Sequence, residues 1–188
     1  MANFDKIIPT ILKHEGGLTN DKYDRGGITN YGISLTFAKD TNDKALLDVD
    51  HDGDIDANDI RKLTKEQAIK VYRKHFWDKA KLDEINSDKI ALAIMDTGVN
   101  HGIYKGISMA QETLNKLGKK VDVDKIMGPQ TINALNSVDP DTFVETYLKS
   151  RKNYYRRIVE TRPTQNMFFR GWMNRLDSLN SAVENLNK

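Results

Sequence analysis

The chain has 188 residues with a formal net charge of +2, from 29 Lys and Arg against 27 Asp and Glu, and it has no cysteine. This length suits one domain or two small lobes with a buried core, and the lack of cysteine excludes disulfides and thiolate metal sites. No stretch approaches about 18 consecutive apolar residues, so the sequence predicts no membrane span.

The first predicted helix covers residues 3–15. Its apolar face recurs at three- and four-residue spacing and consists of Ile7, Ile8, Ile11 and Leu12. Gly16 and Gly17 are expected to end this helix, since glycine is favoured just past a helix C-terminus. Residues 17–33 are polar and rich in glycine, which predicts a small irregular or β element, and a short helix is expected after Ser34.

Helix signals then follow one another towards the C-terminus. Thr64 with Gln67 forms a capping box that opens a helix near 65–78. Further helices are expected after Ser87, near 104–117, from Pro129 to about 136, from Asp139-Pro140 to about 160, and near 166–186. The sequence therefore predicts a mainly α-helical fold with one small irregular or β element.

Two carboxylates flank the glycine-rich segment. Glu15 ends the first predicted helix, where the negative end of the helix dipole disfavours its ionised form, and partial burial would act in the same direction. Asp24 follows nine residues later, and Thr29 five residues after that. A protonated acid facing a second carboxylate is the minimal apparatus for glycoside hydrolysis. Turn glycines beside a helix-end glutamate also occur without catalysis, so spacing alone leaves a structural role open.

Residues 14–33 read HEGGLTNDKYDRGGITNYGI. This segment resembles the signature of glycoside hydrolase family 108, a group of phage and prophage lysozyme-type N-acetylmuramidases. The resemblance implies a lysozyme-like compact helical fold with Glu15, in the E-G-G motif, as the catalytic acid. The same order of residues in phage-type lysozymes implies that Asp24 and Thr29 hold the attacking water.

The resemblance extends along most of the chain. Residues 96–135, from DTGVNHG through MGPQTINAL, resemble the family's C-terminal peptidoglycan-binding region, and residues 168–175, FFRGWMNR, resemble its closing motif. This implies a catalytic lobe over residues 1–95 and a helical C-terminal lobe over residues 96–188, packed as one unit.

Residues 48–59 read DVDHDGDIDAND and fit a twelve-residue, EF-hand-like calcium loop. Gly53 stands at position 6 for the sharp turn, Ile55 at position 8 is the apolar anchor, and Asp54 at position 7 would contribute its backbone carbonyl. Six acids so close would repel one another without a cation, although an acidic solvated turn is the alternative. We expect a structural Ca²⁺ held by Asp48, Asp50, Asp52, Asp54, Asp56 and Asp59. No convincing helix precedes the loop, so a paired calcium switch is not expected.

The acidic loop also hides the charge of the remaining chain. Without its six acids, 21 acidic residues face 29 Lys and Arg, a net charge of +8. This excess of positive charge suits an anionic partner such as a cell wall or nucleic acid, and an ordinary solvated surface explains it equally well. Arg151, Lys152, Arg156 and Arg157 flank Tyr154 and Tyr155, and we expect a solvated or wall-facing surface there rather than a nucleic-acid site.

Several other polar and aromatic residues are candidates for sugar contacts. Asn20 and Tyr31 lie in the glycine-rich segment. Asp96, Asn100 and His101 lie in the segment DTGVNHG that ends a predicted helix, where packing and capping are equally good explanations. Aromatic residues at helical spacing belong more often to a core, so we expect Trp77, Phe168 and Phe169 to be buried. Trp172 suits either a core or a sugar platform.

The sequence thus predicts a muramidase of the endolysin type that acts on peptidoglycan glycan strands with Glu15 as general acid and no catalytic cofactor. A non-catalytic peptidoglycan-binding protein that assists secretion or wall remodelling, and a lytic transglycosylase, are the alternatives. A monomer is expected. The N-terminus lacks the basic-then-apolar layout of a cleavable signal, so we expect synthesis in the cytoplasm and action on the wall after release or non-classical export.

Overall fold

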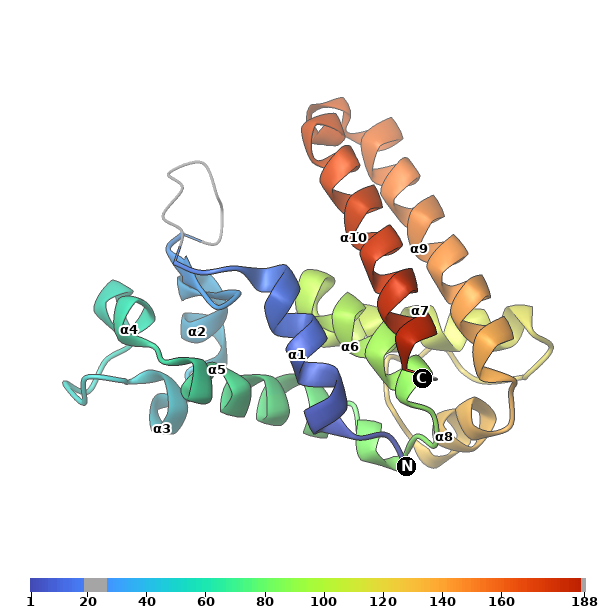
Figure 1. The fold of residues 1–188 in the computed structure, drawn as a ribbon, viewed down its shortest axis with the longest axis horizontal. Helices are drawn as coiled ribbons and strands as arrows, with labels where there is room; N and C mark the ends of the chain where they lie inside the picture. The colour runs from blue at the N-terminus through green and yellow to red at the C-terminus, as the bar shows by residue number, and fades with distance from the viewer. Residues whose placement is uncertain (19–26, 187–188) are drawn as a thin grey trace. The chain divides into compact units, whose positions relative to one another are not determined.

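The computed structural model describes residues 1–18 and 27–186, and helices dominate it, as predicted (Figure 1). The helices of regular length are α1 (Phe4–Glu15), α2 (Leu35–Thr41), α5 (Lys65–Tyr72), α6 (Asp88–His101), α7 (Ile103–Lys116), α8 (Pro129–Asn136), α9 (Pro140–Thr161) and α10 (Asn166–Asn185). The shorter elements are α3 (Lys44–Leu47), α4 (Ala57–Lys62), the π turn η1 (Arg73–Asp78), and the 3₁₀ turns η2 (Leu82–Glu84) and η3 (Pro163–Gln165). The small β element consists of β1 (Thr29–Asn30) and β2 (Ile33–Ser34).

The chain divides into two units, residues Ile8–His75 and a second unit made of Met1–Ile7 with Phe76–Lys188. They are described separately below. The expected lobe boundary between residues 95 and 96 stays a prediction.

The smaller unit is built around the β-hairpin. β1 and β2 pair antiparallel, with Thr29 opposite Ser34 and Asn30 opposite Ile33. Tyr31 and Gly32 form the turn with φ angles of 48° and 78°, and two positive φ angles are characteristic of the type I′ turn that matches the twist of a hairpin. The buried apolar side chains under the hairpin include Ile28, Ile33, Ala38, Leu47, Ile60, Leu63, Val71 and Tyr72.

The predicted caps explain where α2, α5, α6 and α9 begin. The hydroxyl of Thr64 accepts from the backbone of Gln67 while the Gln67 side chain accepts from the backbone of Thr64, which completes the capping box. At the starts of α2, α6 and α9 the side chains of Ser34, Ser87 and Asp139 accept a backbone hydrogen bond, without the reciprocal half of the box. Such a cap stabilises a helix by about 1 kcal/mol, because it satisfies a backbone donor that the helix leaves unpaired.

One predicted helix changes its geometry before its end. The helix expected over 65–78 is α-helical to Tyr72 and continues as the π turn over Arg73–Asp78. A π turn holds one more residue than an α turn and so shifts the side chains that follow it. Phe76 and Trp77 are both buried in this turn, and the core position expected for Trp77 is confirmed.

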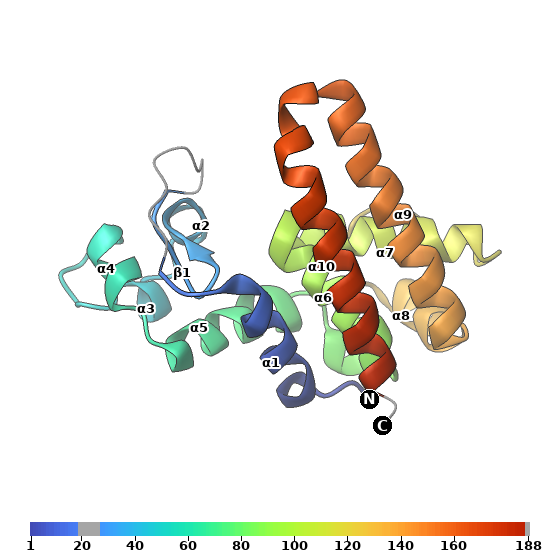
Figure 2. The same ribbon diagram turned by 45° about the horizontal axis from the view of Figure 1, so that its top comes forward.

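In the larger unit α6 is the central helix, since every side chain from Ile90 to Met95 is buried. Gly106 of α7 lies so close to α6 that an added Cβ would be 2.7 Å from the carbonyl oxygen of Ile94. The pair α9 and α10 runs antiparallel through the η3 turn, as both ribbon views show (Figures 1 and 2). Across the described part of the chain, no helix combines the length and apolarity that a bilayer span requires.

Candidate active site

Glu15 is the last residue of α1, as the sequence predicts, and its side chain is half-buried. Gly16 follows with a φ of 68°, the left-handed conformation in which many helices end. The hairpin turn lies against this side chain, because a Cβ added at Gly32 would be 2.7 Å from both Cβ and Cγ of Glu15. The candidate acid is therefore held by the end of a helix on one side and by a tight turn on the other.

Hydrogen bonds from the neighbouring helices hold the hairpin in place. The hydroxyl of Tyr72, in α5, donates to the carbonyl of Tyr31 over 2.8 Å. The side-chain amide of Asn30 donates to the carbonyl oxygens of Ile60 and Leu63 over 3.0 and 3.2 Å. These bonds tie the turn beside Glu15 to buried residues 30 to 41 positions further along the chain.

The residues predicted to hold the attacking water are described in part. Thr29 is half-buried in β1, and its hydroxyl donates to the carbonyl of Gly27 over 3.4 Å. Asp24, and the sugar-contact candidate Asn20, lie outside the described residues. Their roles, and that of Thr29, stay predictions.

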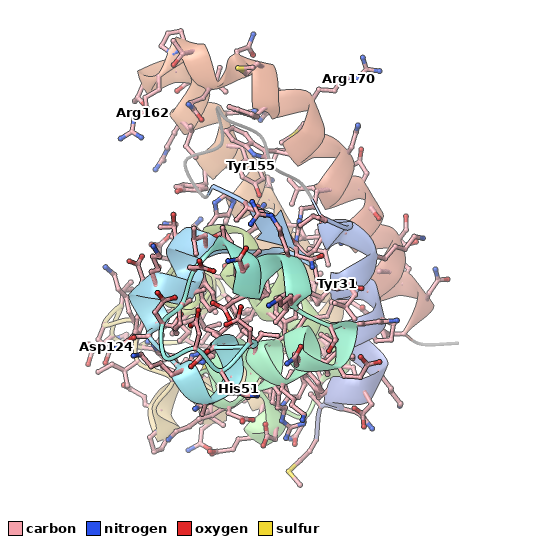
Figure 3. All side chains as sticks on the ribbon, turned by 90° about the vertical axis from the view of Figure 1, so that its left-hand side faces the viewer. Tyr31, His51, Asp124, Tyr155, Arg162 and Arg170 are labelled. Atoms are coloured by element: carbon pink, nitrogen blue, oxygen red, sulfur yellow. The ribbon has the colours of Figure 1, made fainter. Side chains whose placement is uncertain are left out.

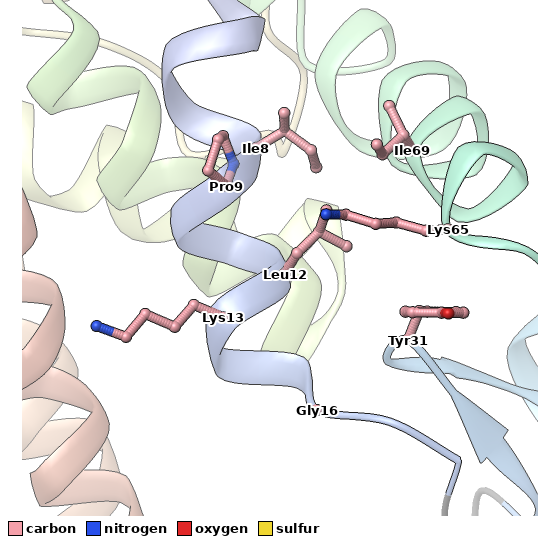
Figure 4. A pocket seen from close by; sticks show the side chains of 8 residues that line it. All are labelled: Ile8, Pro9, Leu12, Lys13, Gly16, Tyr31, Lys65 and Ile69. Atoms are coloured by element: carbon pink, nitrogen blue, oxygen red, sulfur yellow. The ribbon is translucent and has the colours of Figure 1, made fainter.

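A groove of about 430 Å³ opens beside the end of α1 (Figure 4). The groove is lined by residues of α1 and the position that follows it, of the hairpin turn and of α5. These are Ile8, Pro9, Leu12, Lys13 and Gly16, then Tyr31, then Lys65 and Ile69. The sequence analysis predicts a sugar contact for Tyr31 and places Ile8 and Leu12 on the apolar face of the first helix. Ile8 is buried, whereas Leu12 is half-exposed at the groove, and no sequence signal joins α1 and α5 into one groove.

The aspartate loop turns at Gly53 and buries the side chain of Ile55. Gly53 has a φ of 97°, which only glycine adopts without strain, and Ile55 is 7% exposed. Asp56 caps α4, and Asp59 completes the capping box by accepting from the backbone of Asp56. One difference is that a single helical turn, α3, directly precedes the loop, where no convincing helix was predicted.

The loop carboxylates gather in two groups. Asp48, Asp50 and Asp52 each place one oxygen within 4.8 Å of the others, and so do Asp54, Asp56 and Asp59. Like charge raises the pKa of Asp54, with Asp52 as the largest cause. A hydrogen bond of 2.9 Å from Lys62 lowers the pKa of Asp50, while its buried Oδ1 receives no hydrogen bond from any described residue.

The predicted sugar contacts Asn100 and His101 meet at one hydroxyl in the larger unit. Nδ2 of Asn100 donates to Oη of Tyr155 over 3.2 Å, and Nε2 of His101 lies 2.9 Å from the same oxygen. Burial lowers the pKa of His101 to about 4, and the charges of Arg151 and Arg175 add to the effect. The structure thus brings the two residues together, and their contact with sugar stays a prediction.

A buried ion cluster, missed from sequence, supports this hydroxyl. Asp96 is fully buried and accepts from Nη1 of Arg151 over 2.5 Å and from Nη2 of Arg175 over 2.9 Å. Nε of Arg151 also donates to Tyr155 over 2.9 Å. The expectation that Arg151 belongs to a basic surface is therefore wrong, since burying its charge is compensated by Asp96.

The aromatic residues of the α9–α10 pair differ in part from expectation. Phe168 is 48% exposed, so its predicted core position is wrong. Trp172 is half-buried and stacks on Tyr155 with the ring centroids 4.9 Å apart. Arg162 and Arg170 extend outwards from the same pair of helices (Figure 3). Phe168 lies in the first turn of α10, directly after the η3 turn that joins the two helices.

Two family models match successive parts of the chain. Residues 8–102 match the family model described as Glycosyl hydrolase 108, and residues 105–177 match the one described as Predicted Peptidoglycan domain. The chain is similar to a solved structure titled "Structure of Brucella abortus SagA", with 24% sequence identity and a TM-score of 0.76 over 96% of this chain and 92% of that chain. At this identity the likeness shows a shared fold. Comparison with curated proteins finds no match.

Proposed function

The chain belongs to the glycosyl hydrolase 108 family, and on that basis we propose that it cleaves the β-1,4 bond between N-acetylmuramic acid and N-acetylglucosamine. The two family matches support a glycoside hydrolase with peptidoglycan as its substrate. In this proposal the protein is a lysozyme of the endolysin type.

The observation that carries the proposal is the position of Glu15. Its carboxyl stands at the C-terminal end of α1, half-buried and in contact range of the hairpin turn, beside an open groove. A carboxylic acid in this position is able to donate a proton to the oxygen of a departing sugar. Glu15 is therefore the proposed general acid.

The second half of the mechanism needs a water molecule. We propose that Asp24 directs it, helped by the hydroxyl of Thr29, so that the configuration at the anomeric carbon is inverted. A separation of about 6.5–9.5 Å between the Glu15 and Asp24 carboxyls goes with inversion, and about 5–5.5 Å goes with a covalent intermediate. The anomer released first, observed by NMR during digestion, distinguishes the two.

The test is the Glu15→Gln variant on purified sacculi. Gln has nearly the shape of Glu but no proton to donate, so the release of reducing ends should fall at least about hundredfold. Glu66→Gln is the matched control, since Glu66 is exposed on α5 in the same unit and should keep full activity. Circular dichroism of both variants checks the fold, and lysis by a folded Glu15→Gln protein would refute the assignment.

The match to a peptidoglycan domain over residues 105–177 also favours a second candidate, a binding protein without hydrolytic activity. That protein would retain sacculi in a pull-down but release no reducing ends. Mass spectrometry of the digest separates both from a lytic transglycosylase, whose products end in anhydro-muramic acid.

We further propose that the aspartate loop holds a structural Ca²⁺. Asp48, Asp50, Asp52, Asp56 and Asp59 would offer carboxylates, and Asp54 its backbone carbonyl. The buried Oδ1 of Asp50, which no described residue satisfies, supports the proposal because buried carboxylate oxygens normally have a partner. The ion would also offset the repulsion that raises the pKa of Asp54. No step of the proposed cleavage depends on it.

A further inference from the structure

The groove beside α1 combines an apolar floor with positive charge. Ile8, Pro9, Leu12 and Ile69 supply the apolar side chains, and the ring of Tyr31 lies at one end (Figure 4). A volume of about 430 Å³ lies within the range of sites that bind small molecules. A matching ligand therefore carries short alkyl groups and has about the size of a few amino-acid residues.

The charge over the groove comes from Lys65. Its side chain extends from α5 across the groove towards α1, whereas Lys13, which also lines the groove, leaves α1 on the side away from Lys65 (Figure 4). Lys65 is exposed, and within the described residues it forms no ion pair. An ammonium group over an apolar floor favours a ligand that carries a carboxylate next to methyl groups.

The groove lies next to the proposed acid. Leu12 and Glu15 are three residues apart on α1, which makes their side chains neighbours on the helix surface. The hairpin turn joins the two places as well, since Tyr31 lines the groove and the next residue, Gly32, packs against Glu15. A sugar at Glu15 would therefore carry its substituents within reach of the groove.

We propose that this groove binds the acidic peptide stem of peptidoglycan, on the N-acetylmuramic acid whose glycosidic bond Glu15 is proposed to protonate. The inference rests on the proposed function, because that sugar bears the stem through its lactyl group. The lactyl and alanine methyl groups match the apolar floor, and a carboxylate of the stem matches the ammonium group of Lys65. The groove thereby selects wall strands that still carry peptides.

The direct test is an NMR titration of the full chain with a soluble stem peptide, L-Ala-γ-D-Glu-meso-diaminopimelate-D-Ala. Signals of Leu12, Tyr31 and Ile69 should shift, and Lys65→Glu should weaken binding about three- to tenfold, because attraction becomes repulsion. Lys70→Glu is the matched control, since Lys70 is exposed on the same helix outside the groove. Unchanged affinity in Lys65→Glu, or shifts confined to other residues, would overturn the proposal.

Digestion of two substrates separates this inference from the proposed function. The protein should cut intact sacculi faster than glycan strands stripped of peptides by an amidase, and Lys65→Glu should lose that preference. Equal wild-type rates on both substrates would refute the groove assignment and leave the muramidase intact. Peptide binding at the groove without cleavage of either substrate would refute the muramidase alone.

Discussion

At the scale of single residues, Gly32 determines the surroundings of the candidate acid. A Cβ at this position would be 2.4 Å from Oη of Tyr72 and 2.7 Å from Cβ of Glu15, and the φ of 78° disfavours any L side chain. We expect Gly32→Ala to lower the free energy of unfolding by about 2–5 kcal/mol. We also expect turnover on sacculi to fall about ten- to hundredfold as Glu15 is displaced. Urea unfolding and a reducing-end assay measure the two effects.

Gly118→Ala provides the control for the backbone contribution. Gly118 has a φ of 82°, but an added Cβ would meet nothing within 4 Å. Gly118→Ala should therefore lower the free energy of unfolding by only about 1–2 kcal/mol and keep full activity. If Gly32→Ala behaved like Gly118→Ala in both assays, the packing of the turn against Glu15 would contribute neither to stability nor to activity.

The sequence predicts some residues of the site well and others poorly. Glu15 was placed correctly because its determinants are local, an apolar helical stripe followed by glycine. Arg151 was placed wrongly because its determinant, Asp96, lies 55 residues away, and neither residue carries a local signal of burial. Tyr31 was named as a sugar contact, but the lysines and apolar residues around it come together only through the packing of α1 on α5.

At the scale of elements, the acidic loop is predicted to add stability only when calcium is bound. Removal of the ion with EDTA should lower the melting temperature by about 5–10 °C when Ca²⁺ is supplied at roughly 100 times its dissociation constant. Asp52→Asn should reduce that shift, because Asp52 would coordinate through its carboxylate. Differential scanning calorimetry with and without Ca²⁺ measures it.

Asp54→Asn is the matched variant within the loop, since Asp54 would contribute its backbone carbonyl and is exposed. It should keep the full calcium effect. No effect of EDTA on metal-loaded protein, or an equal loss in both variants, would contradict the proposed coordination.

The predictability of the elements follows the range of the interactions that form them. The helices α2, α5, α6 and α9 begin where the sequence predicts, because a cap and the donor that it satisfies are three residues apart. The helix α4, which Asp56 caps, was not predicted. The π turn over Arg73–Asp78 and the single turn α3 have no such local signal. Both are decided by which side chains the core accepts.

At the scale of the whole molecule, the burial of His101 beside the charges of Arg151 and Arg175 should make stability depend on pH. The pKa of His101 is lowered from 6.5 to about 4. The unfolded chain therefore binds a proton in this range before the folded chain does, and stability present above about pH 6.5 is lost as the pH falls to about 4. The loss amounts to about 3 kcal/mol at most. Chemical unfolding at a series of pH values measures it.

His101→Gln should flatten this pH dependence, since Gln keeps a polar contact with Tyr155 and does not titrate. His51→Gln should leave it unchanged, because His51 is exposed in the acidic loop (Figure 3). A His101→Gln protein with the wild-type slope between pH 4 and 6.5 would show that the dependence arises from the carboxylates instead.

The mainly α-helical class and the peptidoglycan-directed family followed from the sequence, because helix periodicity and the segment around Glu15 are both local patterns. The close crossing of α6 and α7 did not, since Gly106 and the Ile94 carbonyl that it approaches meet only in the folded chain. The three-helix ion cluster escaped prediction for the same reason.

The two-residue hairpin turn has a practical consequence for anyone who wishes to redirect this protein to a different wall chemistry. Tyr31 borders the groove and its neighbour Gly32 borders Glu15, so mutagenesis of the turn would alter recognition and catalysis together. Lys65 and Ile69 line the groove from α5, on the side opposite α1, and they are not part of the turn that packs against Glu15. A library of variants at those two positions would sample new preferences for the peptide stem while the residues that pack against Glu15 stay unchanged.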